Sequence, residues 1–387
     1  MFKRRHSTRD TLSARTARSA GQAASEKRRP DADSPMFASL EARCMFSFSW
    51  SADEVYLTEL VNRARENPVA EGVRLGLDLT AGLTSGELAR LVPQEPLALN
   101  SMLTVAARLQ SLDMAERDFF DHVNPDGHDP TWRAQHQGYA GTAGENIAAG
   151  YGSIDEVHAA WLDSLGHRKN VLSLHEDFDA SFHYDEFGPG FAFTQIGPFF
   201  DYHTQVFGVR TTPTPFILGV VFNDANSDVF YNVGEGMTGV RIDVALQSSP
   251  GSVVGTYTTD AAGNYQIAVP AGSYNVTFTN LSNATQYTTT TVVSSVNKKV
   301  DARAAQFAVV ADDYADDGQY DQAEPATGNE VGEVFINGSI EIAADTDLFH
   351  YTAGRTGLTY IIVVTSSGSL DATFSVYSSP QILLGNS

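Results

Sequence analysis

The sequence predicts a multidomain protein in which helices packed on a small sheet are followed by two mainly antiparallel β-sandwich modules. The length of 387 residues suits two or three domains of ordinary size, and the 42% apolar content is enough to build their cores. Helical periodicity and helix-capping signals occupy residues 51–210. From residue 217 onward they give way to short alternating segments punctuated by Gly and Asn, which is typical of β-sandwiches.

Three helices are expected in the first domain, beginning after Ser51, Asn100 and Ser153. Ser51 and Ser153 are each followed by Glu three residues later, which is the capping-box pattern of a helix N-terminus. Aromatic-rich segments predict strands over 178–184, 190–196 and 202–209. The Thr/Pro-rich stretch 211–216 is interpreted as a linker, which makes 217–303 and 309–387 the two β modules.

The charge of the chain is unevenly distributed. Residues 1–34 carry nine Lys or Arg and four Asp or Glu, whereas the remaining 353 residues carry 16 and 43, for an overall net charge of −22. The strong negative charge of these remaining residues disfavours nucleic acid as a partner. Residues 1–50 lack both periodicity and an apolar signal-peptide core, so we interpret them as a disordered basic tail. No apolar run suits a transmembrane helix, and the single cysteine excludes an intramolecular disulfide.

Histidine is concentrated in the first domain, where eight of the ten His residues fall between positions 122 and 203. Histidine is the commonest metal ligand and the usual general base near neutral pH. The domain contains neither a His-Glu-x-x-His zinc-protease motif nor a Gly-x-Ser-x-Gly nucleophile elbow. The histidines therefore indicate polar chemistry in this domain without specifying a reaction.

Five motifs in order along the first domain carry a family resemblance. They are LVNRARENP (60–68), LNSMLTVAARLQSLDMAERDFFDHVNPDG (99–127), GYAGTAGENIAAGY (138–151), WLDSLGHRKNVL (161–172) and DYHTQVFG (201–208). Together they resemble the CAP superfamily of cysteine-rich secretory, antigen-5 and pathogenesis-related proteins, and they fit its bacterial, disulfide-free branch best. The resemblance implies a three-layer α-β-α sandwich, with a cleft that carries two His and two Glu in the better-studied branches.

Carried over position by position, the resemblance matches His122 to the first cleft His and Glu145 to the first cleft Glu. It puts Ser164 at the second Glu position and Tyr202 at the second His position, with His203 one residue later. Because adjacent strand residues point to opposite faces, His203 cannot replace the missing His without a bulge or a register slip. Two interpretations stay open. His122 and His203 bind a divalent metal such as Zn²⁺, as the two His do in some members, or His122 and Glu145 hydrogen-bond one another and order the cleft loops.

The tripeptide Gly166-His167-Arg168, common in the bacterial branch, follows the third expected helix. We expect it at the C-terminus of that helix, where Gly supplies the turn and the two basic side chains meet the negative end of the helix dipole. His167 is also a candidate addition to a metal site in the cleft.

Residues 224–235 have the oxygen spacing of a calcium loop. Asp224, Asn226 and Asp228 alternate, and Glu235 occupies the twelfth position, where a carboxylate can bind Ca²⁺ through both oxygens. The sixth position, Gly in an EF-hand, is Val229, and strands rather than helices are expected on either side. The loop is predicted to bind Ca²⁺, and the alternative is an Asx-rich turn.

Both β modules also carry family resemblances. FNDANSD (222–228) and GEGMTGVRIDV (234–244) resemble the B-type repeats of bacterial surface adhesins, in which such a loop holds calcium. DTDLFHYTA (345–353) resembles the pre-peptidase C-terminal domain of secreted bacterial enzymes. That family continues with further strands, so the module over 309–387 is expected to be incomplete.

Two functions are consistent with these features. In the first, the protein is secreted or displayed on a bacterial surface, its cleft binds an extracellular ligand such as a cell-wall or surface component, and the β modules are calcium-stiffened spacers. In the second, it is an extracellular hydrolase of peptide or cell-wall material that uses His122 and Glu145, with or without a metal. The segment SLEARCMFS (39–47) resembles a Leu-Glu-x-Arg motif near the start of exported bacterial proteins. The oligomeric state stays open.

Overall fold

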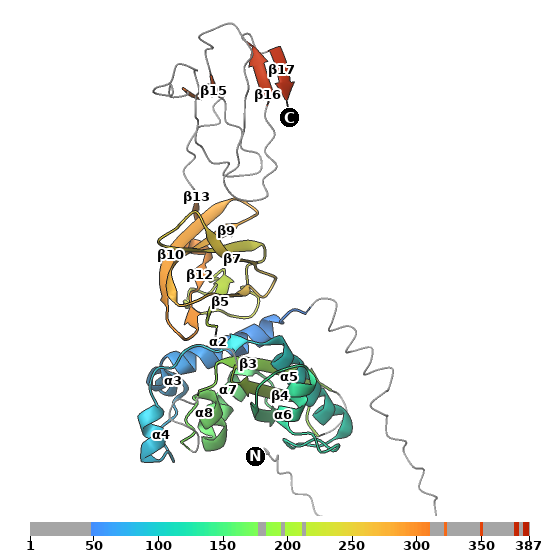
Figure 1. Ribbon diagram of the computed structural model, residues 1–387. Coiled ribbons are helices and arrows are strands. Elements are labelled where there is room, and N and C mark those ends of the chain that lie inside the picture. Colours follow the sequence, from blue (N-terminus) through green and yellow to red (C-terminus); the bar gives the residue numbers. More distant parts are fainter. Residues whose placement is uncertain are drawn as a thin grey trace, which may run out of the picture. The chain divides into compact units, whose positions relative to one another are not determined.

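The computed structural model describes residues 48–176, 183–194, 198–210 and 214–309, together with four short strands further along the chain (Figure 1). The expected tail, apart from its last residues, and the segment 39–47 lie outside the described residues. So do residues 211–213 of the expected linker and most of the module expected over 309–387. Within that module the described strands are β14 (Asp321–Gln322), β15 (Phe349–His350), β16 (Ser375–Ser378) and β17 (Ile382–Asn386).

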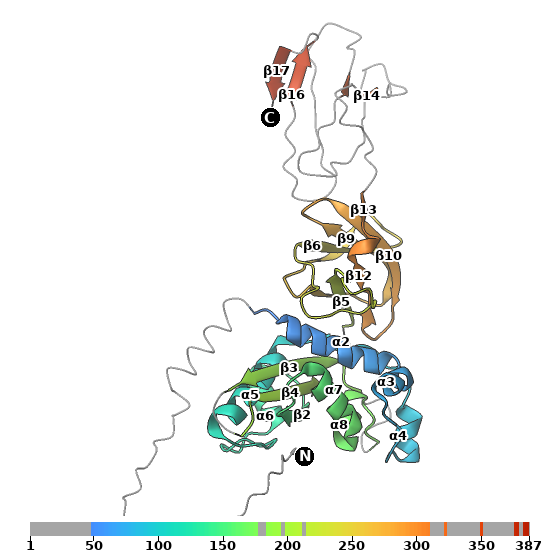
Figure 2. The same cartoon turned by 180° about the vertical axis from the view of Figure 1, so that it is seen from behind.

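The first domain contains helices wrapped around a four-stranded sheet (Figure 2). The helices are α2 (Ala52–Glu66), α3 (Pro68–Leu75), α4 (Ser85–Arg90), α5 (Ser101–Arg117), α6 (Pro130–His136), α7 (Ile154–Asp163) and α8 (Leu165–Val171). The strands are β1 (Ala98–Leu99), β2 (Ala143–Ala149), β3 (Glu186–Phe193) and β4 (Asp201–Gly208). Their order in the sheet is β1-β3-β4-β2, with β1 parallel to β3 and the other two pairs antiparallel.

The predicted helix starts are confirmed. Ser51 caps α2 in a complete capping box with Glu54, Asn100 caps α5, and Ser153 accepts a hydrogen bond from the backbone N–H of Glu156 at the start of α7. The strands predicted over 190–196 and 202–209 correspond to β3 and β4. Most of the strand expected over 178–184 lies outside the described residues.

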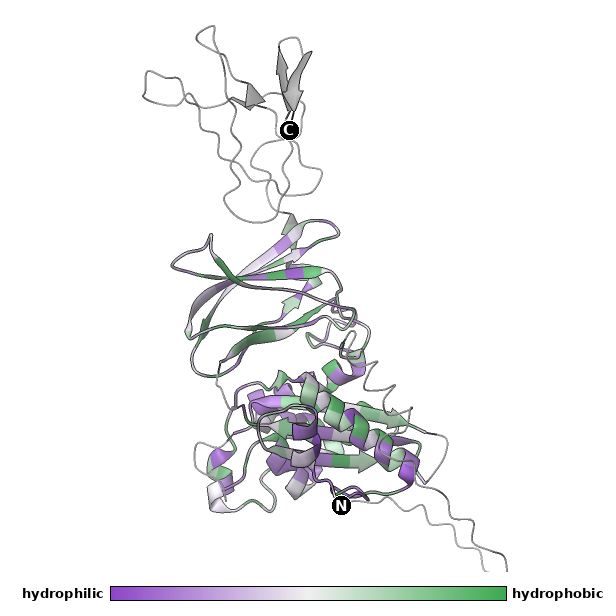
Figure 3. Cartoon of the chain, turned by 45° about the vertical axis from the view of Figure 1, so that its right-hand side comes forward, coloured by the Kyte–Doolittle hydropathy of each residue, from purple (hydrophilic) through white to green (hydrophobic). Residues whose placement is uncertain are grey.

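Two apolar layers make this domain an α-β-α sandwich, as expected. On one face of the sheet, α5 and α6 pack through Leu103 and Ala134 against Val206 of β4. On the other face, α2, α7 and α8 contribute side chains such as Val61 and Trp161 to a core shared with the sheet. Figure 3 shows apolar residues recurring along the strands, while polar and apolar residues alternate around the helices, which is the pattern of elements that bury one face.

Two glycines allow α5 to lie unusually close to β3. A Cβ atom on Gly188 would come within 2.2 Å of the backbone of Leu103, and one on Gly190 within 2.2 Å of the backbone of Arg108. The hydroxyl of Ser111 bridges the same contact, because it lies 3.0 Å from the carbonyl oxygen of Gly190. Larger residues at either glycine would force the helix off the sheet.

Arg65 ties together several segments of the domain. Its fully buried guanidinium donates to the carbonyl oxygens of Glu95 (2.9 Å), Val171 (3.0 Å) and Tyr184 (3.1 Å) and to the hydroxyl of Ser173 (3.0 Å). Burial lowers the pKa of Arg65 to about 10, so it remains charged at neutral pH. A buried cation is tolerated here because its donors are satisfied.

The B-type module contributes two sheets, which belong to different compact units of the chain. The first unit contains the described residues up to Thr238, Thr259–Ala271 and Val293–Arg303, and the second contains the remainder. In the first unit, β5 (Phe216–Phe222) pairs antiparallel with β8 (Asn264–Ala268) and parallel with β11 (Lys298–Lys299) and β12 (Ala302–Arg303).

The second unit holds a five-stranded sheet. Its strands are β6 (Val240–Leu246), β7 (Val253–Thr258), β9 (Gly272–Asn280), β10 (Thr285–Val293) and β13 (Ala308–Val309), in the order β13-β10-β9-β6-β7. The pairs of β6 with β7 and β9, and of β10 with β13, are antiparallel. Taken together, the two sheets of this module consist of mostly antiparallel strands, as predicted, and the short strands β11 and β12 are the parallel ones. Among the described residues, no helix is long and apolar enough to cross a membrane.

Candidate functional site: the His122–Glu145 cleft

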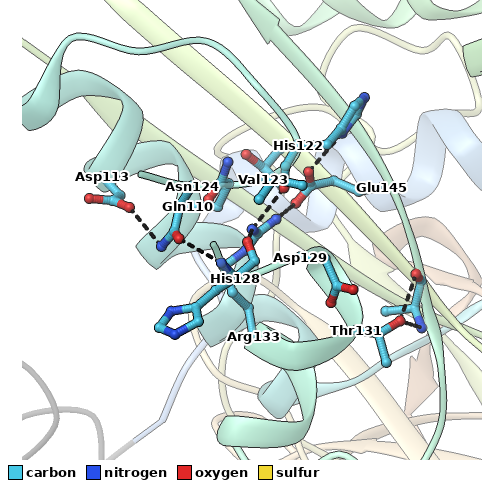
Figure 4. Close-up of polar contacts among 12 residues, drawn as sticks. Gln110, Asp113, His122, Val123, Asn124, His128, Asp129, Thr131, Arg133 and Glu145 are labelled. Carbon is cyan, nitrogen blue, oxygen red and sulfur yellow. Dashed lines mark hydrogen bonds and ion pairs between the residues drawn. The ribbon is translucent and has the colours of Figure 1, made fainter. Parts of the chain in front are cut away.

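His122 and Glu145, the two cleft residues matched by the family resemblance, lie in contact (Figure 4). His122 follows α5 in a loop and Glu145 lies in β2. The Nδ1 atom of His122 is 2.9 Å from Oε1 of Glu145. The other carboxylate oxygen forms an ion pair with Arg133 of α6. The side chain of Glu145 is 1% exposed, whereas that of His122 is 48% exposed.

This contact fixes which nitrogen of His122 carries hydrogen. A carboxylate only accepts hydrogen bonds, so Nδ1 of His122 must donate to Glu145. In the neutral imidazole, Nε2 then holds the lone pair, on a ring that is half exposed. His122 can therefore accept a proton or a hydrogen bond from a bound molecule.

Arg133 holds both the carboxylate and the loop around it. Besides Glu145, its guanidinium donates to the backbone carbonyl oxygens of His122 (2.9 Å) and His128 (2.8 Å). One buried cation thereby fixes the backbone that carries the imidazole and the carboxylate that orients it (Figure 4).

A buried amide cluster connects β2 to α8 beside this pair. The side-chain amide of Asn146 donates to the carbonyl oxygen of His167 (3.1 Å) and to Oε1 of Gln205 (2.9 Å). That of Asn170 donates to Oδ1 of Asn146 (2.8 Å) and to the carbonyl oxygen of Glu145 (3.2 Å). The cluster fixes α8, and with it His167, against the strand that carries Glu145.

A cavity of about 100 Å³ lies between β2 and the two helices α7 and α8. Its lining comprises Ile147, Ala148, Tyr151, Ala160, Trp161, Asp163 and His167. Within the described part of the chain, the buried indole Nε1 of Trp161 has no hydrogen-bond partner. Burial lowers the pKa of His167 to about 4. His167 is therefore neutral at physiological pH.

Tyr202 and His203 lie on opposite faces of β4, as the strand argument predicts. Tyr202 is buried in the layer of Met114 and Ala149, on the α5 side of the sheet. His203 is buried among Phe191 and Trp161 on the other side, with ring centroids 5.3 and 6.5 Å apart. No bulge interrupts the pairing of β4 with β2.

His203 is an unusual buried histidine. Its Nε2 lies 3.2 Å from Oδ1 of Asp201, but neither ring nitrogen is aligned for a hydrogen bond with any described residue. Asp201 instead accepts hydrogen bonds from the backbone N–H groups of Gly150 (2.6 Å) and Gly152 (2.9 Å). Interaction with His203, followed by hydrogen bonds from the backbone N–H groups of Tyr151 (3.0 Å) and Gly150, lowers the pKa of Asp201 despite its partial burial. Asp201 thus fixes the turn that follows β2.

The structure does not bring the expected metal pair together. His203 pairs in register with Ala148, three residues along β2 from Glu145, and on the opposite face of the sheet. Among the residues that the structure describes, no group of three His, Cys, Asp or Glu side chains is arranged to hold a metal ion. Catalytic zinc needs three protein ligands, so the residues present do not fit a zinc centre in the cleft.

The tripeptide Gly166-His167-Arg168 does not lie at the C-terminus of a helix as expected, because a new helix begins just before it. Ser164 ends α7 and precedes α8, and its side chain makes no capping hydrogen bond there. Gly166, His167 and Arg168 lie inside α8 rather than at the C-terminus of α7, because the chain starts a new helix directly after Ser164. Arg168 nevertheless binds the end of α7, donating to the carbonyl oxygens of Leu162 (2.8 Å) and Asp163 (3.3 Å).

The calcium-type loop gathers its four expected oxygen-bearing residues in one turn structure between β5 and β6. Glu235 accepts hydrogen bonds from the backbone N–H groups of Ala225 (3.0 Å) and Asn232 (2.9 Å). Asp224 accepts one from the N–H of Val229 (3.2 Å). Asp228 accepts hydrogen bonds from the N–H of Phe230 (2.9 Å) and from the side-chain amide of Asn226 (3.0 Å).

The hydrogen bonds to Asp228 favour its charged form. Burial raises the pKa of Asp228, but hydrogen bonds from Asn232, Phe230 and Asn226 outweigh it and lower that pKa. Val229, at the sixth position of the loop, has a φ of 65°. This left-handed conformation is the one that Gly adopts without strain, so the backbone turns here as a calcium loop requires even though the residue is β-branched.

Comparison with known families agrees with the α-β-α architecture of the first domain and with the antiparallel sheets that follow it. Residues 58–174 match the cysteine-rich secretory protein (CAP) family, and residues 217–327 match the SdrD B-like domain. The chain therefore contains a CAP domain over the first of these ranges, followed by a B-like module. The second match ends within the segment where the further β module is expected.

Individual relatives cover limited parts of the chain. The uncharacterized protein YkwD of Bacillus subtilis (strain 168) is 41% identical over 80 residues, which are 20% of this chain and 31% of that protein. The chain thus spans about a third of the length of this relative. The structure of an extracellular SCP-domain protein from Bacillus anthracis is 28% identical, covers 30% of this chain and 34% of its own, and has a TM-score of 0.24. An outer surface protein of Borrelia burgdorferi is 19% identical, covers 38% of this chain and 96% of its own, and has a TM-score of 0.26.

Several site residues were not identified from the sequence. Arg133 and Asn170 contribute to the site through partners 12 and 24 residues away along the chain, and Trp161 lines the neighbouring cavity. Trp161 opens the motif WLDSLGHRKNVL, whose residues give no sign of an unpartnered indole N–H. Such groups become visible only once the helices are packed on the sheet.

Proposed function

We propose that this protein is secreted or displayed on the bacterial surface and that its CAP cleft binds an extracellular ligand, such as a component of the cell wall or surface. The observation that carries the proposal is the half-exposed imidazole of His122, held by buried Glu145, close to a cavity that His167 lines. Similarity to an extracellular SCP-domain protein and to an outer surface protein supports the location.

The volume of the cavity limits which part of a ligand can enter it. At about 100 Å³, it is smaller than the several hundred Å³ typical of sites that enclose a whole small molecule. It suits one side group of a larger molecule that otherwise stays outside. Trp161 offers an N–H without a partner and His167 is neutral, so an apolar group next to a hydrogen-bond acceptor fits best.

Binding to purified bacterial cell walls tests this proposal. Sedimentation of the full chain with cell-wall material is compared for the wild type, Trp161→Phe and His122→Ala, with His136→Ala on α6 as the control. We expect both cleft variants to weaken binding about tenfold, since each removes one hydrogen-bonding group. Equal sedimentation of all four proteins, or none above background, would contradict the proposal.

A hydrolase is the second candidate, and one observation favours it. Glu145 fixes the hydrogen of His122 on Nδ1, which leaves Nε2 able to accept a proton from an attacking water. The test is turnover of extracellular peptide and cell-wall substrates by the wild type and by the His122→Ala, Glu145→Ala double variant. Turnover that is equal in both proteins would rule out this mechanism.

We also propose that the B-like module binds Ca²⁺ through Asp224, Asn226, Asp228 and Glu235. All four offer oxygen atoms, which are the ligands that this hard cation prefers. Three carboxylates in one short loop repel one another, and a bound divalent cation would relieve that repulsion. The support is their convergence in a loop whose backbone makes the required turn at Val229.

A further inference from the structure

The first sheet of the B-like module sends polar side chains into the backbone of the CAP domain. The amide nitrogen of Asn297 donates to the carbonyl oxygens of Pro96 (3.0 Å) and Asp185 (2.9 Å), just before β1 and β3. Its amide oxygen accepts from the backbone N–H of Phe216 in β5 (3.1 Å). Asn297 is buried, so one side chain satisfies groups of three separate segments.

An ion pair and a second amide lie beside Asn297. The Nζ atom of Lys299 is 2.8 Å from Oε2 of Glu59 on α2, and Lys299 also pairs with Asp301. The side chain of Glu59 is only 5% exposed. Gln266 of β8 donates to the carbonyl oxygen of Leu99 in β1 (2.9 Å). Separating the two surfaces would break these bonds together, and removing one partner while the surfaces stay in contact would leave the other buried and unpaired.

The calcium-type loop contacts the same helix through its aromatic residues. The ring of Phe230 lies under the guanidinium of Arg63, at 4.4 Å, and its centroid is 6.2 Å from that of Tyr56. The hydroxyl of Tyr56 in turn donates to Asp155 in the first turn of α7 (2.8 Å). Tyr231 is fully buried in this region. The loop thus supports α2 and, through Tyr56, α7.

The apolar core continues across this contact without a break. Val220, Phe222, Tyr231 and Ala262 of the B-like module belong to the same buried cluster as Val55 and Trp161 of the CAP domain. The cavity that remains between Leu99 and Leu218 measures only about 20 Å³, which leaves room for about one water molecule. A surface packed to this density is typical of a protein interior.

We infer that α2 and the start of β1 form a docking surface of the CAP domain, and that its partner is the sheet β5-β8-β11-β12 of the same chain. The two fold and open as one cooperative unit. The inference goes beyond the two binding proposals, because it requires neither a cleft ligand nor Ca²⁺. It also differs from the expectation that the β module is only a spacer after the CAP domain. The partner is recognised by backbone acceptors at Pro96, Asp185 and Leu99 and by the carboxylate of Glu59.

Hydrogen exchange of the full chain, read by mass spectrometry, tests this inference. Asn297→Ala removes two hydrogen bonds to the CAP domain, and Lys299→Met keeps the apolar stem but removes the partner of Glu59. The matched control is Asn280→Ala, which removes an amide from a turn of the second unit, where Asn280 accepts from Ser282. The regions compared are the peptides of α2 and residues 96–99 and, as an internal reference, those of α5.

For both interface variants we expect exchange of α2 and residues 96–99 to be at least about tenfold faster than in the wild type, with α5 changed less. Asn280→Ala should leave α2 unchanged. If Asn297→Ala does not fold, loss of the CAP domain through a substitution in the B-like module supports the inference by itself, and Lys299→Met supplies the graded result. Unchanged exchange of α2 in folded Asn297→Ala and Lys299→Met proteins would overturn it.

Discussion

Arg133 and Glu145 form a buried ion pair in which the arginine occupies one carboxylate oxygen and leaves the other to His122. This division of the two carboxylate oxygens sets the geometry of the cleft, because the oxygen not bound by Arg133 accepts the hydrogen bond from His122 and so orients its imidazole. Arg133 also holds the loop through two backbone carbonyl oxygens. The CAP cleft in this chain is therefore built around a three-residue arrangement, with only its outermost member, His122, half exposed.

Arg133→Met should destabilise the CAP domain by about 3 kcal/mol, because it leaves the Glu145 carboxylate buried without its cation. The three tryptophans, Trp50, Trp132 and Trp161, all lie in this domain, so urea unfolding followed by tryptophan fluorescence reports on it. The control in the same domain is Arg74→Met, whose side chain is 55% exposed in its pair with Glu71; it should cost less than about 1 kcal/mol, because Arg63 and His158 still pair with Glu71. Equal losses in the two variants would show that Arg133 has no special role.

The sequence allowed the helix starts and the opposed faces of Tyr202 and His203 to be predicted, because both depend on local rules. A capping box is a matter of residues three apart, and strand alternation has a period of two. Arg133 could not be identified in this way, since its role depends on a carboxylate 12 residues away in another element. Asn297 is a stronger example, with partners 112 and 201 residues distant. Polar contacts of this kind leave no periodic signal.

Zinc titration of the full chain should show no stoichiometric site in the cleft. His203 lies on the face of the sheet opposite to Glu145, which holds His122, and within the described residues no three His, Cys, Asp or Glu side chains are arranged to hold a metal ion. Calorimetry of the wild type and of His122→Ala should therefore give the same weak isotherm. A one-to-one site in the wild type that disappears in His122→Ala would contradict this prediction and make metal-assisted hydrolysis worth screening.

The stability of the CAP domain should fall in acid as Glu71 becomes protonated. The buried carboxylate of Glu71 is bound by Arg63 (2.7 Å), Arg74 (3.2 Å) and His158 (3.2 Å). Burial raises its pKa, but hydrogen bonds from His158 and Arg63 outweigh this effect and lower the pKa to about 2. Because the pKa in the folded state is below the unfolded value of about 4.3, the stabilisation is complete above that value and is lost as pH falls toward 2.

This effect is measured by comparing urea unfolding at pH 6 and pH 3. Protonation of Glu71 should account for about 2 kcal/mol of the loss in the wild type. Glu71→Gln should remove that share of the pH dependence, although it lowers stability at pH 6. Glu156→Gln, at an exposed position of α7, is the control and should leave the pH dependence intact. A pH dependence that survives unchanged in Glu71→Gln would show that other groups cause it.

Asp228→Ala should reduce the stabilisation that Ca²⁺ gives to the B-like module. A ligand that binds only the folded loop raises the melting temperature by mass action, and a carboxylate removed from the donor set weakens that binding. The control is Asp260→Ala, because Asp260 accepts a hydrogen bond from the N–H of Ala262 (2.9 Å), as Asp228 does from the N–H of Phe230 (2.9 Å).

Calorimetric melting of the full chain is recorded in millimolar calcium and in chelator. The control variant should lose the same number of degrees in both conditions, since only a local hydrogen bond is removed. Asp228→Ala should lose more in calcium than in chelator, and an equal loss in both would mean that its carboxylate serves the turn alone and binds no cation.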